Sequence, residues 1–185
     1  PDTGSLPPMA AGLFGYFGYD MIRHIETIPN NNPASLNAPD SDLLRPSLIA
    51  IFDRLRDSIT LVTQIRPAEW GDAESAWETA QTRLNDAVRA LDAPLLPTEV
   101  GRIDAPIPTP TSNMSQSNFL DMVRRAKEYI AAGDIFQVVL SQRFTIPFEL
   151  PAFNLYRSLR RLNPSPFLFF FKFDGLSVVC SRPEI

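Results

Sequence analysis

Hydrophobic residues in this chain follow two spacings, and the shorter one predicts β-strands. Apolar and β-branched residues fill positions 46–53 and 58–65, and the charged stretch between them makes this arrangement typical of a β-hairpin. A second hairpin is predicted near the end of the chain, where apolar runs at 167–173 and 176–180 flank the Asp-Gly pair at 174–175. Asp-Gly is a strong turn signal, because both residues tolerate the left-handed backbone of a two-residue hairpin turn.

The longer spacing, of three and four residues, predicts three helices. They cover residues 72–91, 118–132 and 152–162, and each carries its apolar residues on one face. Asn118 is the expected N-terminal cap of the second helix, because its side chain can accept a hydrogen bond from a free backbone N–H of the first turn. Trp77 is the expected core anchor of the first helix, which we expect to cover the sheet.

The first 45 residues combine an aromatic, glycine-rich stretch with loop composition. Residues 10–23 predict a strand in which another backbone can approach closely at Gly12, Gly15 and Gly18. A phosphate-binding loop is rejected there, because the glycine spacing is wrong and no Lys-Ser or Lys-Thr pair follows. Residues 30–45 contain an asparagine run and prolines, which predicts a loop. His24 is the single histidine and is more simply a surface residue than a catalyst.

A proline-rich stretch divides the chain. Residues 93–117 contain prolines at 94, 97, 106, 108 and 110, so they cannot form a helix and are predicted to run as an extended linker. This predicts an N-terminal α+β subdomain over residues 1–92 and the beginning of a second domain over residues 118–185. The predicted fold class is α+β, with antiparallel sheets and helices packed outside them.

Between the second predicted helix and the rest of the second domain lies an apolar strand with a polar face. Residues 131–144 read Ala-Ala-Gly-Asp-Ile-Phe-Gln-Val-Val-Leu-Ser-Gln-Arg-Phe, and Gly133 can take the left-handed conformation that ends a helix. Side chains alternate along a strand, so one face of this one would carry Ile135, Gln137, Val139, Ser141 and Arg143. A row of amide, hydroxyl and guanidinium groups is typical either of a solvent-exposed strand face or of a site for a polar ligand. The pattern leaves both open.

Composition and charge narrow the classes of function. With 185 residues, 44% of them hydrophobic and 21% charged, the chain can bury a sizeable core. A net charge of -4 leaves no basic footprint for nucleic acid or an acidic membrane surface. Cys180 is the only cysteine, which excludes an internal disulfide, and no apolar run reaches transmembrane length. These features predict a globular protein of the reducing cytoplasm, and the termini suggest a piece excised from a longer chain.

Three strings, in order and spread over most of the chain, resemble anthranilate synthase component I of the chorismate-binding enzymes. They are Gly-Tyr-Phe-Gly-Tyr-Asp at 15–20, Ala-Gly-Asp-Ile-Phe-Gln-Val-Val with Ser-Gln-Arg-Phe at 132–144, and Asn-Pro-Ser-Pro-Phe at 163–167 followed by Ser-Arg-Pro-Glu at 181–184. The family's polypeptides are much longer, so the chain resembles an internal part of them. Residues 1–92 would then correspond to a regulatory part and 118–185 to a truncated catalytic domain.

The resemblance implies a lyase of tryptophan biosynthesis that converts chorismate and ammonia to anthranilate and pyruvate. It implies a glutamine amidotransferase subunit as the partner that supplies ammonia, and tryptophan as a feedback effector. Magnesium is also implied, with its ligands expected beyond Ile185. We therefore expect this chain alone to be inactive, and its unpaired strands to favour self-association.

The resemblance also assigns roles to individual residues. Glu184 corresponds to the acid that protonates the leaving hydroxyl of chorismate. Gln137 matches the position at which water-adding relatives carry a lysine base, and an amide suits ammonia because ammonia needs no strong base to act as a nucleophile. The feedback tryptophan site corresponds to six consecutive residues: Asn163, Pro164, Ser165, Pro166, Phe167 and Leu168. No metal ligand is assigned within the chain.

Other readings stay open beside this one. The chain could come from an aminodeoxychorismate or isochorismate synthase, although Val139 argues mildly against the first, whose similar string tends to have asparagine there. It could also act as a tryptophan-binding regulatory or structural module without catalysis. Cys180 and Arg182 depart from the family pattern near Glu184, and a guanidinium there favours the ionised carboxylate and works against an acid role.

Overall fold

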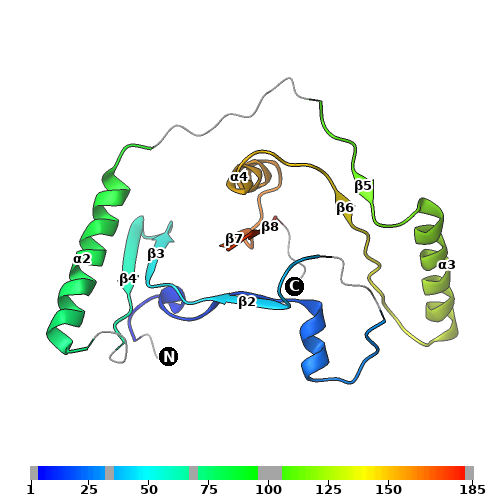
Figure 1. Ribbon diagram of the computed structural model, residues 1–185, viewed down its shortest axis with the longest axis horizontal. Coiled ribbons are helices and arrows are strands. Elements are labelled where there is room, and N and C mark those ends of the chain that lie inside the picture. The colour runs from blue at the N-terminus through cyan, green and yellow to red at the C-terminus, as the bar shows by residue number, and fades with distance from the viewer. Residues whose placement is uncertain (1–3, 32–35, 67–70, 96–105, 182–185) are drawn as a thin grey trace. The chain divides into compact units, whose positions relative to one another are not determined.

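The computed structural model describes residues 4–31, 36–66, 71–95 and 106–181, whose helices and strands are labelled in Figure 1. The chain divides into two compact units. One unit comprises residues 1–97 together with 165–185, and the other comprises residues 98–164. The break near residue 97 falls within the stretch predicted as a linker. The C-terminal hairpin groups with the first unit, so the division into 1–92, 93–117 and 118–185 stays a prediction.

The first predicted hairpin is confirmed. Strands β3 (Leu48–Asp53) and β4 (Ser58–Thr63) pair antiparallel along their whole length. In the turn, Asp53 Oδ1 accepts a hydrogen bond from Leu55 N at 2.9 Å, and Asp57 takes a left-handed φ of 49°. A short aspartate side chain that bonds the backbone two residues on is a common turn device, so the hairpin is determined locally.

Helix α2 (Ala73–Asp92) begins where the sequence predicts. Its cap is Asp72, whose Oδ1 accepts a hydrogen bond from Ser75 N at 2.9 Å and so satisfies one of the free N–H groups of the first turn. Near the middle of the helix, Arg83 Nη1 donates to Thr63 Oγ1 at 3.2 Å, and this bond joins α2 to the end of β4. The helix therefore packs on the hairpin, as expected.

The prediction that Trp77 anchors α2 is wrong. Trp77 is 60% exposed, whereas Ala76 and Ala80 are buried. These two alanines lie four residues apart on one face of the helix, and Trp77 lies one residue further round, about 100° away. Small side chains let the helix approach the hairpin closely, so the contact face is built from alanine rather than from the largest apolar residue.

The glycine-rich stretch forms a short strand between two 3-10 helices. Strand β1 (Phe14–Phe17) follows η1 (Pro8–Ala10) and precedes η2 (Tyr19–His24), so the strand predicted over 10–23 is shorter than expected. It pairs antiparallel with β2 (Ser41–Leu44), which lies in a stretch predicted as a loop. That loop prediction is therefore wrong for these four residues, since their composition gave no sign of a strand partner far away in sequence.

Two of the three glycines act as predicted. A Cβ added at Gly15 would lie 1.9 Å from the carbonyl oxygen of Asp42, and one added at Gly18 would lie 2.9 Å from that of Asp40. At both positions the backbone approaches another stretch of backbone more closely than a side chain allows. At Gly12 an added Cβ would meet nothing within 4 Å.

The C-terminal hairpin is also confirmed. Strands β7 (Phe169–Phe173) and β8 (Leu176–Cys180) pair antiparallel around the predicted Asp-Gly turn, in which Gly175 has a φ of 69°. Phe173 is 7% exposed and is the largest of the four buried hydrophobic residues among the described ranges, the others being Ala10, Ala76 and Ala80. This hairpin therefore supplies a central part of the first unit's core.

The described residues of the second unit form two helices and one short strand pair. Helix α3 (Gln116–Ala132) and helix α4 (Ala152–Leu162) are both predicted elements, while β5 (Thr111–Ser112) pairs with β6 (Phe144–Thr145). The predicted cap of α3 is wrong, because Ser115 and not Asn118 accepts the capping bond, from Asn118 N at 3.2 Å. Helices with small antiparallel sheets make an α+β protein, so the predicted fold class is confirmed.

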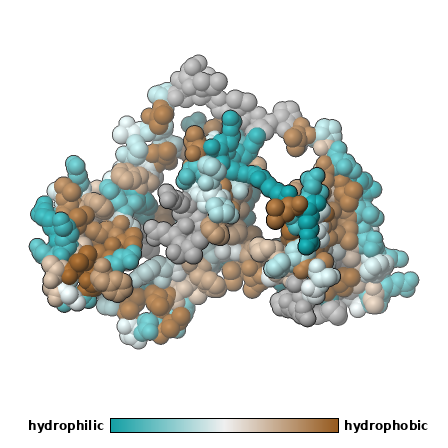
Figure 2. All heavy atoms as spheres, turned by 180° about the vertical axis from the view of Figure 1, so that it is seen from behind, coloured by the Kyte–Doolittle hydropathy of each residue, from teal (hydrophilic) through white to brown (hydrophobic). Residues whose placement is uncertain are grey.

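Many large apolar side chains remain exposed in the described ranges. Phe136 is 94% exposed, Leu162 82% and Tyr19 87%, and Figure 2 shows hydrophobic spheres at the surface among hydrophilic ones. Extensive apolar exposure of this kind is typical of surfaces that contact other polypeptide. Self-association stays a prediction. None of the helices in the described ranges is long and apolar enough to cross a membrane.

Candidate functional site

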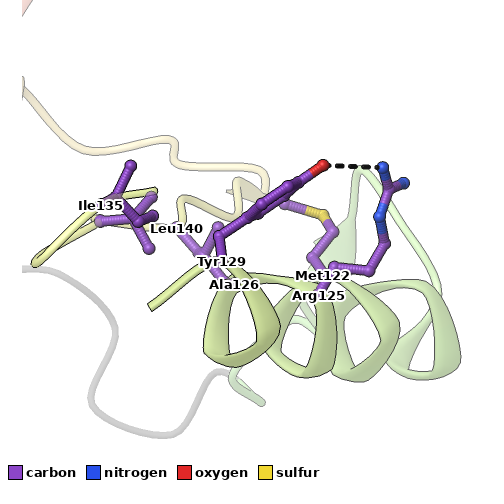
Figure 3. A pocket seen from close by; sticks show the side chains of 7 residues that line it. Met122, Arg125, Ala126, Tyr129, Ile135 and Leu140 are labelled. Atoms are coloured by element: carbon purple, nitrogen blue, oxygen red, sulfur yellow. Dashed lines mark hydrogen bonds between the residues drawn. The ribbon is translucent and has the colours of Figure 1, made fainter. Parts of the chain in front are cut away.

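The candidate site is built on the segment that follows α3. Gly133, at the C-terminal cap, has a left-handed φ of 82°, and the next N–H, of Asp134, bonds back to Tyr129 O at 3.0 Å. This closure ends the helix as predicted and reverses the chain direction. Residues 134–143 then run back beside α3, as the close-up in Figure 3 shows for Ile135 and Leu140.

The strand predicted over these residues is wrong except at its end. Only Phe144–Thr145 forms regular pairing, and no strand of the described part of the chain pairs with residues 134–143. A strand needs a neighbour to satisfy its backbone N–H and C=O groups, whereas a helix satisfies its own. The composition of a strand is present here, but the partner is not among the described residues.

The far end of the segment is fixed by a small polar network. Asn113 N donates to Arg143 O at 3.0 Å, and Arg143 N donates to Asn113 Oδ1, also at 3.0 Å. Gln142 Nε2 donates to Ser112 Oγ at 2.8 Å. These three bonds tie residues 142–143 to the stretch around β5, so the segment is held at both ends.

One side of the segment lines an apolar cavity of about 200 Å³ against α3 (Figure 3). From the segment come Ile135, Val138 and Leu140, and from the helix come Met122, Arg125, Ala126 and Tyr129. Met122, Ala126 and Tyr129 follow the three- and four-residue spacing predicted for the apolar face of the helix, and Arg125 lies beside them. At the rim, Arg125 Nη2 donates to Tyr129 Oη at 3.5 Å.

The predicted faces of the segment need one correction. Strict alternation placed Ile135 with Gln137 and Val139, but Ile135 lines the cavity together with Val138 and Leu140. The two-residue period therefore breaks between 135 and 138, because unpaired backbone is not held in a pleat. Gln137 does not line this cavity, and its side chain is exposed.

The polar row is only partly assembled. Ser141 is exposed like Gln137, while Arg143 is half-buried and makes contacts of its own. It is Gln142, from the opposite face of the predicted strand, that makes the side-chain bond to Ser112. The polar residues thus lie on one stretch of chain, with Gln137 and Ser141 exposed and Arg143 half-buried.

The second predicted catalytic residue cannot be placed. Glu184 lies outside the described residues, as does Arg182, so no distance relates Glu184 to Gln137. Cys180, the last residue of β8, is half-buried and free. The roles of Glu184 and Gln137 stay predictions.

The predicted tryptophan segment leads from α4 into β7. Asn163 N bonds to Leu159 O at 2.8 Å and ends the helix, and Phe167 N bonds to Ser165 Oγ at 3.3 Å. Phe167 is 53% exposed and Leu168 is half-buried. An exposed aromatic ring next to a bend is compatible with a ligand contact, but binding here stays a prediction.

Titration and metal chemistry give no further candidate. The pKa of Asp72 is lowered, chiefly by the hydrogen bond from Ser75 N and then by its side-chain hydroxyl, and this belongs to the α2 cap. Within the described ranges, no three His, Cys, Asp or Glu side chains are grouped so that they could hold a metal ion.

Sequence reasoning missed an aromatic cluster in the strand that directly follows the tryptophan segment. The rings of Phe169 and Phe171 lie 5.0 Å apart, those of Phe171 and Phe173 lie 5.8 Å apart, and Tyr16 meets Phe173 edge-on at 5.6 Å. The signal was available in part, because three phenylalanines at a spacing of two must share one face of a strand. Their contact with Tyr16 could not be read from the sequence.

Comparison with known proteins gives consistent matches. The family model described as chorismate binding enzyme matches residues 2–185. Anthranilate synthase component 1 of Cereibacter sphaeroides is 48% identical over 97% of this chain and 36% of its own length, and that of Pseudomonas putida is 37% identical over 100% of the chain and 38% of its own length. The chain thus spans a little over a third of the length of these relatives.

A solved structure gives the same result at the level of the fold. The crystal structure of anthranilate synthase component I from Streptococcus pneumoniae matches with a TM-score of 0.81 and 29% sequence identity. The match covers 98% of this chain and 40% of the solved chain. The agreement extends over nearly all of the sequence, so it does not rest on a few motifs.

Proposed function

The chain belongs to the chorismate-binding enzymes, and from this premise we propose that it is part of the synthase component of an anthranilate synthase. The observation that carries the proposal is the shared name of the compared relatives, one of which is 48% identical along nearly the whole chain. The complete protein would convert chorismate and ammonia to anthranilate and pyruvate in tryptophan biosynthesis. The ammonia would come from glutamine through an amidotransferase subunit, and the number in the name "component 1" supports a second component.

The chemistry requires two kinds of group from this part of the protein. The ring hydroxyl of chorismate leaves only if it is protonated, and we assign that proton to the carboxyl group of Glu184. The incoming ammonia must be held beside the ring, and we assign this to the side-chain amide of Gln137. That amide is exposed and does not line the apolar cavity beneath the segment, so it is free to face a substrate.

The residue at position 137 also distinguishes addition of ammonia from addition of water within the family. Ammonia is a competent nucleophile when neutral, whereas water needs a base to remove its proton. An amide can accept a hydrogen bond from ammonia but cannot act as that base. Glutamine at this position therefore favours addition of an amine over addition of water, and disfavours the isochorismate synthase alternative.

Magnesium enters no step of this proposal. It would supply charge to hold the substrate carboxylates, but the described residues offer no group of ligands that fits it. Tryptophan is proposed as the feedback effector, with the segment Asn163–Leu168 as part of its site. A cytoplasmic location is proposed on the basis of the biosynthetic role.

A product analysis tests the catalytic assignments. In a full-length protein that carries this sequence, Gln137→Lys should lower the formation of anthranilate and allow addition of water, because it replaces the orienting amide with a potential base. Glu184→Gln should suppress every route that consumes chorismate, because the hydroxyl would leave unprotonated. Acid catalysis typically contributes about 10²- to 10⁴-fold to the rate, and a loss of that order is expected. Products are separated by chromatography with ammonium supplied directly.

The matched control is Gln116→Lys, which makes the same change at an exposed glutamine in the first turn of α3. It should leave the products unchanged. Normal anthranilate output from Gln137→Lys would show that this segment does not line the active site.

The alternative is a tryptophan-binding module without catalysis. An activity assay of the 185-residue chain tests how much of the catalytic site this chain contains. We expect no anthranilate from this chain with chorismate, magnesium and ammonium, because one acid and one amide supply only part of the acceleration. Anthranilate fluorescence that grows with protein concentration would show that the site is more complete than we propose.

A further inference from the structure

The aromatic side chains that follow the tryptophan segment form a continuous row. Phe169, Phe171 and Phe173 share one face of β7, and their ring centroids lie 5.0 and 5.8 Å apart along it. Rings at such separations, in tilted or edge-on arrangements, attract one another beyond the simple burial of their area. Phe173, at the far end of the row, is 7% exposed, so the row is anchored in the core of the first unit.

Tyr16 extends the row into another part of the sequence. Its ring meets Phe173 edge-on at 5.6 Å with an interplanar angle of 70°. Its hydroxyl donates to Pro39 O at 2.8 Å, so the ring is held at both of its ends. The next residue back, Gly15, lies against the backbone of Asp42 so closely that β1 has no room to shift towards β2. Tyr16 is therefore a fixed point for the row.

The tryptophan segment depends on this row for its position. Among the described residues its hydrogen bonds are local, from Asn163 N back to α4 and from Phe167 N to Ser165 Oγ. Leu168 leads directly into Phe169, the first ring of the row. Ser165–Leu168 group with β7 in the first unit and have few bonds of their own, so the strand that they enter decides where their side chains lie.

We propose that Tyr16, Phe171 and Phe173 are positioning residues for effector binding at Ser165–Leu168, the part of the tryptophan segment that belongs to the same unit as the row. This rests on the proposed function, in which that segment binds tryptophan. The rings do not need to touch the ligand. They hold β7 in one place, and loss of a ring lets the strand and the segment before it move, so part of the binding energy is spent on ordering them. The row thus sets the affinity for the effector without contacting it.

The test uses a full-length protein carrying this sequence and measures the dissociation constant for L-tryptophan by calorimetry. Phe171→Leu keeps an apolar side chain in the strand but interrupts the row, and should weaken tryptophan binding about fivefold, as distant substitutions commonly do. Phe171→Tyr keeps the ring and should bind as the parent does. Formation of anthranilate without tryptophan should stay unchanged in both, because the row lies outside the proposed catalytic residues.

Two further variants show whether a change in affinity comes from the row or from a general loss of structure. Phe52→Leu changes a 63% exposed phenylalanine of β3, in the same unit but outside the row, and should leave the affinity unchanged. Tyr16→Phe keeps every ring and removes only the bond to Pro39, so it should fold normally and weaken binding by about threefold.

The outcomes separate the two proposals. If the parent protein binds no tryptophan, the regulatory part of the proposed function fails and this inference fails with it. If the parent binds but Phe171→Leu and Tyr16→Phe bind equally well, the inference alone is overturned. Weaker binding by Phe52→Leu to the same degree would also overturn it, because the effect would then not belong to the row.

Discussion

Two apolar stretches of this chain have the composition of strands, yet only one of them forms a sheet. The hairpin of β7 and β8 pairs fully and buries Phe173, whereas residues 134–143 form no strand pairing in the described part of the chain and leave Phe136 94% exposed. The hairpin finds its partner strand two residues away across the turn at 174–175. The segment after α3 has no apolar strand within such a short distance.

The comparison shows that an apolar composition allows a strand to form, and that the presence of a partner strand decides whether it does. Strand β1 supports this, because it pairs with β2 more than twenty residues away, where two glycines let the backbones meet. Sequence distance alone therefore does not prevent pairing. Because the chain covers 36% of its relative from Cereibacter sphaeroides, we expect the partner of residues 134–143 in the remainder of a full-length protein.

The largest effect is expected where a paired strand is turned into an unpaired one. Gly15→Val would place a Cβ 1.9 Å from Asp42 O, which no side chain tolerates, and should cost about 3 kcal/mol or unpair β1 from β2. Hydrogen exchange of the β1 amides measures it. Gly12→Val is the control for adding a valine side chain, since nothing lies within 4 Å of its Cβ, although its φ of 138° adds some strain of its own. Protected β1 amides in Gly15→Val would contradict the close approach.

The next effect compares one phenylalanine from each region. Phe173→Ala should lower the free energy of unfolding of the first unit by about 3 kcal/mol, because it removes a buried ring and leaves a cavity. Phe136→Ala should change the stability of this chain by less than about 0.5 kcal/mol, because that ring is exposed. Urea titration of both variants measures the difference.

The same two substitutions, Phe173→Ala and Phe136→Ala, can be measured in a full-length protein to test whether the segment gains a partner strand there. Phe136→Ala should become costly there if a partner strand and its side chains cover the segment. An unchanged, small effect would mean that residues 134–143 stay unpaired even in the complete protein, contrary to our expectation.

A smaller loss of stability, equal at the two sites, is expected when the glycine of each of two turns is replaced. Gly133 has a φ of 82° and Gly175 a φ of 69°, and an added Cβ at either would meet nothing within 4 Å. Alanine at each should therefore cost only the left-handed backbone penalty, about 1 kcal/mol. Hydrogen exchange in the last turn of α3 and in the β7–β8 hairpin measures the two costs separately. A much larger cost at one of them would show that its turn depends on tertiary packing.

The smallest effect concerns a purely local contribution, the cap of α2. Asp72 has a pKa below its ordinary value of 3.8, because the N–H of Ser75 stabilises the carboxylate in the folded chain. A lowered pKa means that this contribution is complete above pH 3.8 and is lost as the pH falls through the lower, folded value. Helicity measured by circular dichroism should therefore decline on acidification, and less so in Asp72→Asn, which keeps a neutral cap. Equal declines in both would exclude the carboxylate as the cause.

Much of the local structure and part of the candidate site could be predicted. The hairpins at β3–β4 and β7–β8, the helices α2, α3 and α4, and the helix end at Gly133 follow from spacing and turn chemistry. The resemblance that identified the family also came from short strings. The arrangement of the site could not be predicted, because Gln137 and Glu184 are far apart in sequence and only long-range packing can bring them together.

The sequence alone therefore determined those elements whose hydrogen-bond partners lie a few residues away. Tertiary structure decided the rest: that Ala76 and Ala80 rather than Trp77 face the hairpin, that Ser41–Leu44 becomes a strand against β1, and that Phe169, Phe171, Phe173 and Tyr16 form one row. A helix or a tight hairpin satisfies its own backbone, so local residues suffice to specify it. A strand edge, a buried face or an aromatic contact is stabilised by residues distant in the chain. The positions of those residues are fixed only when the whole unit has folded.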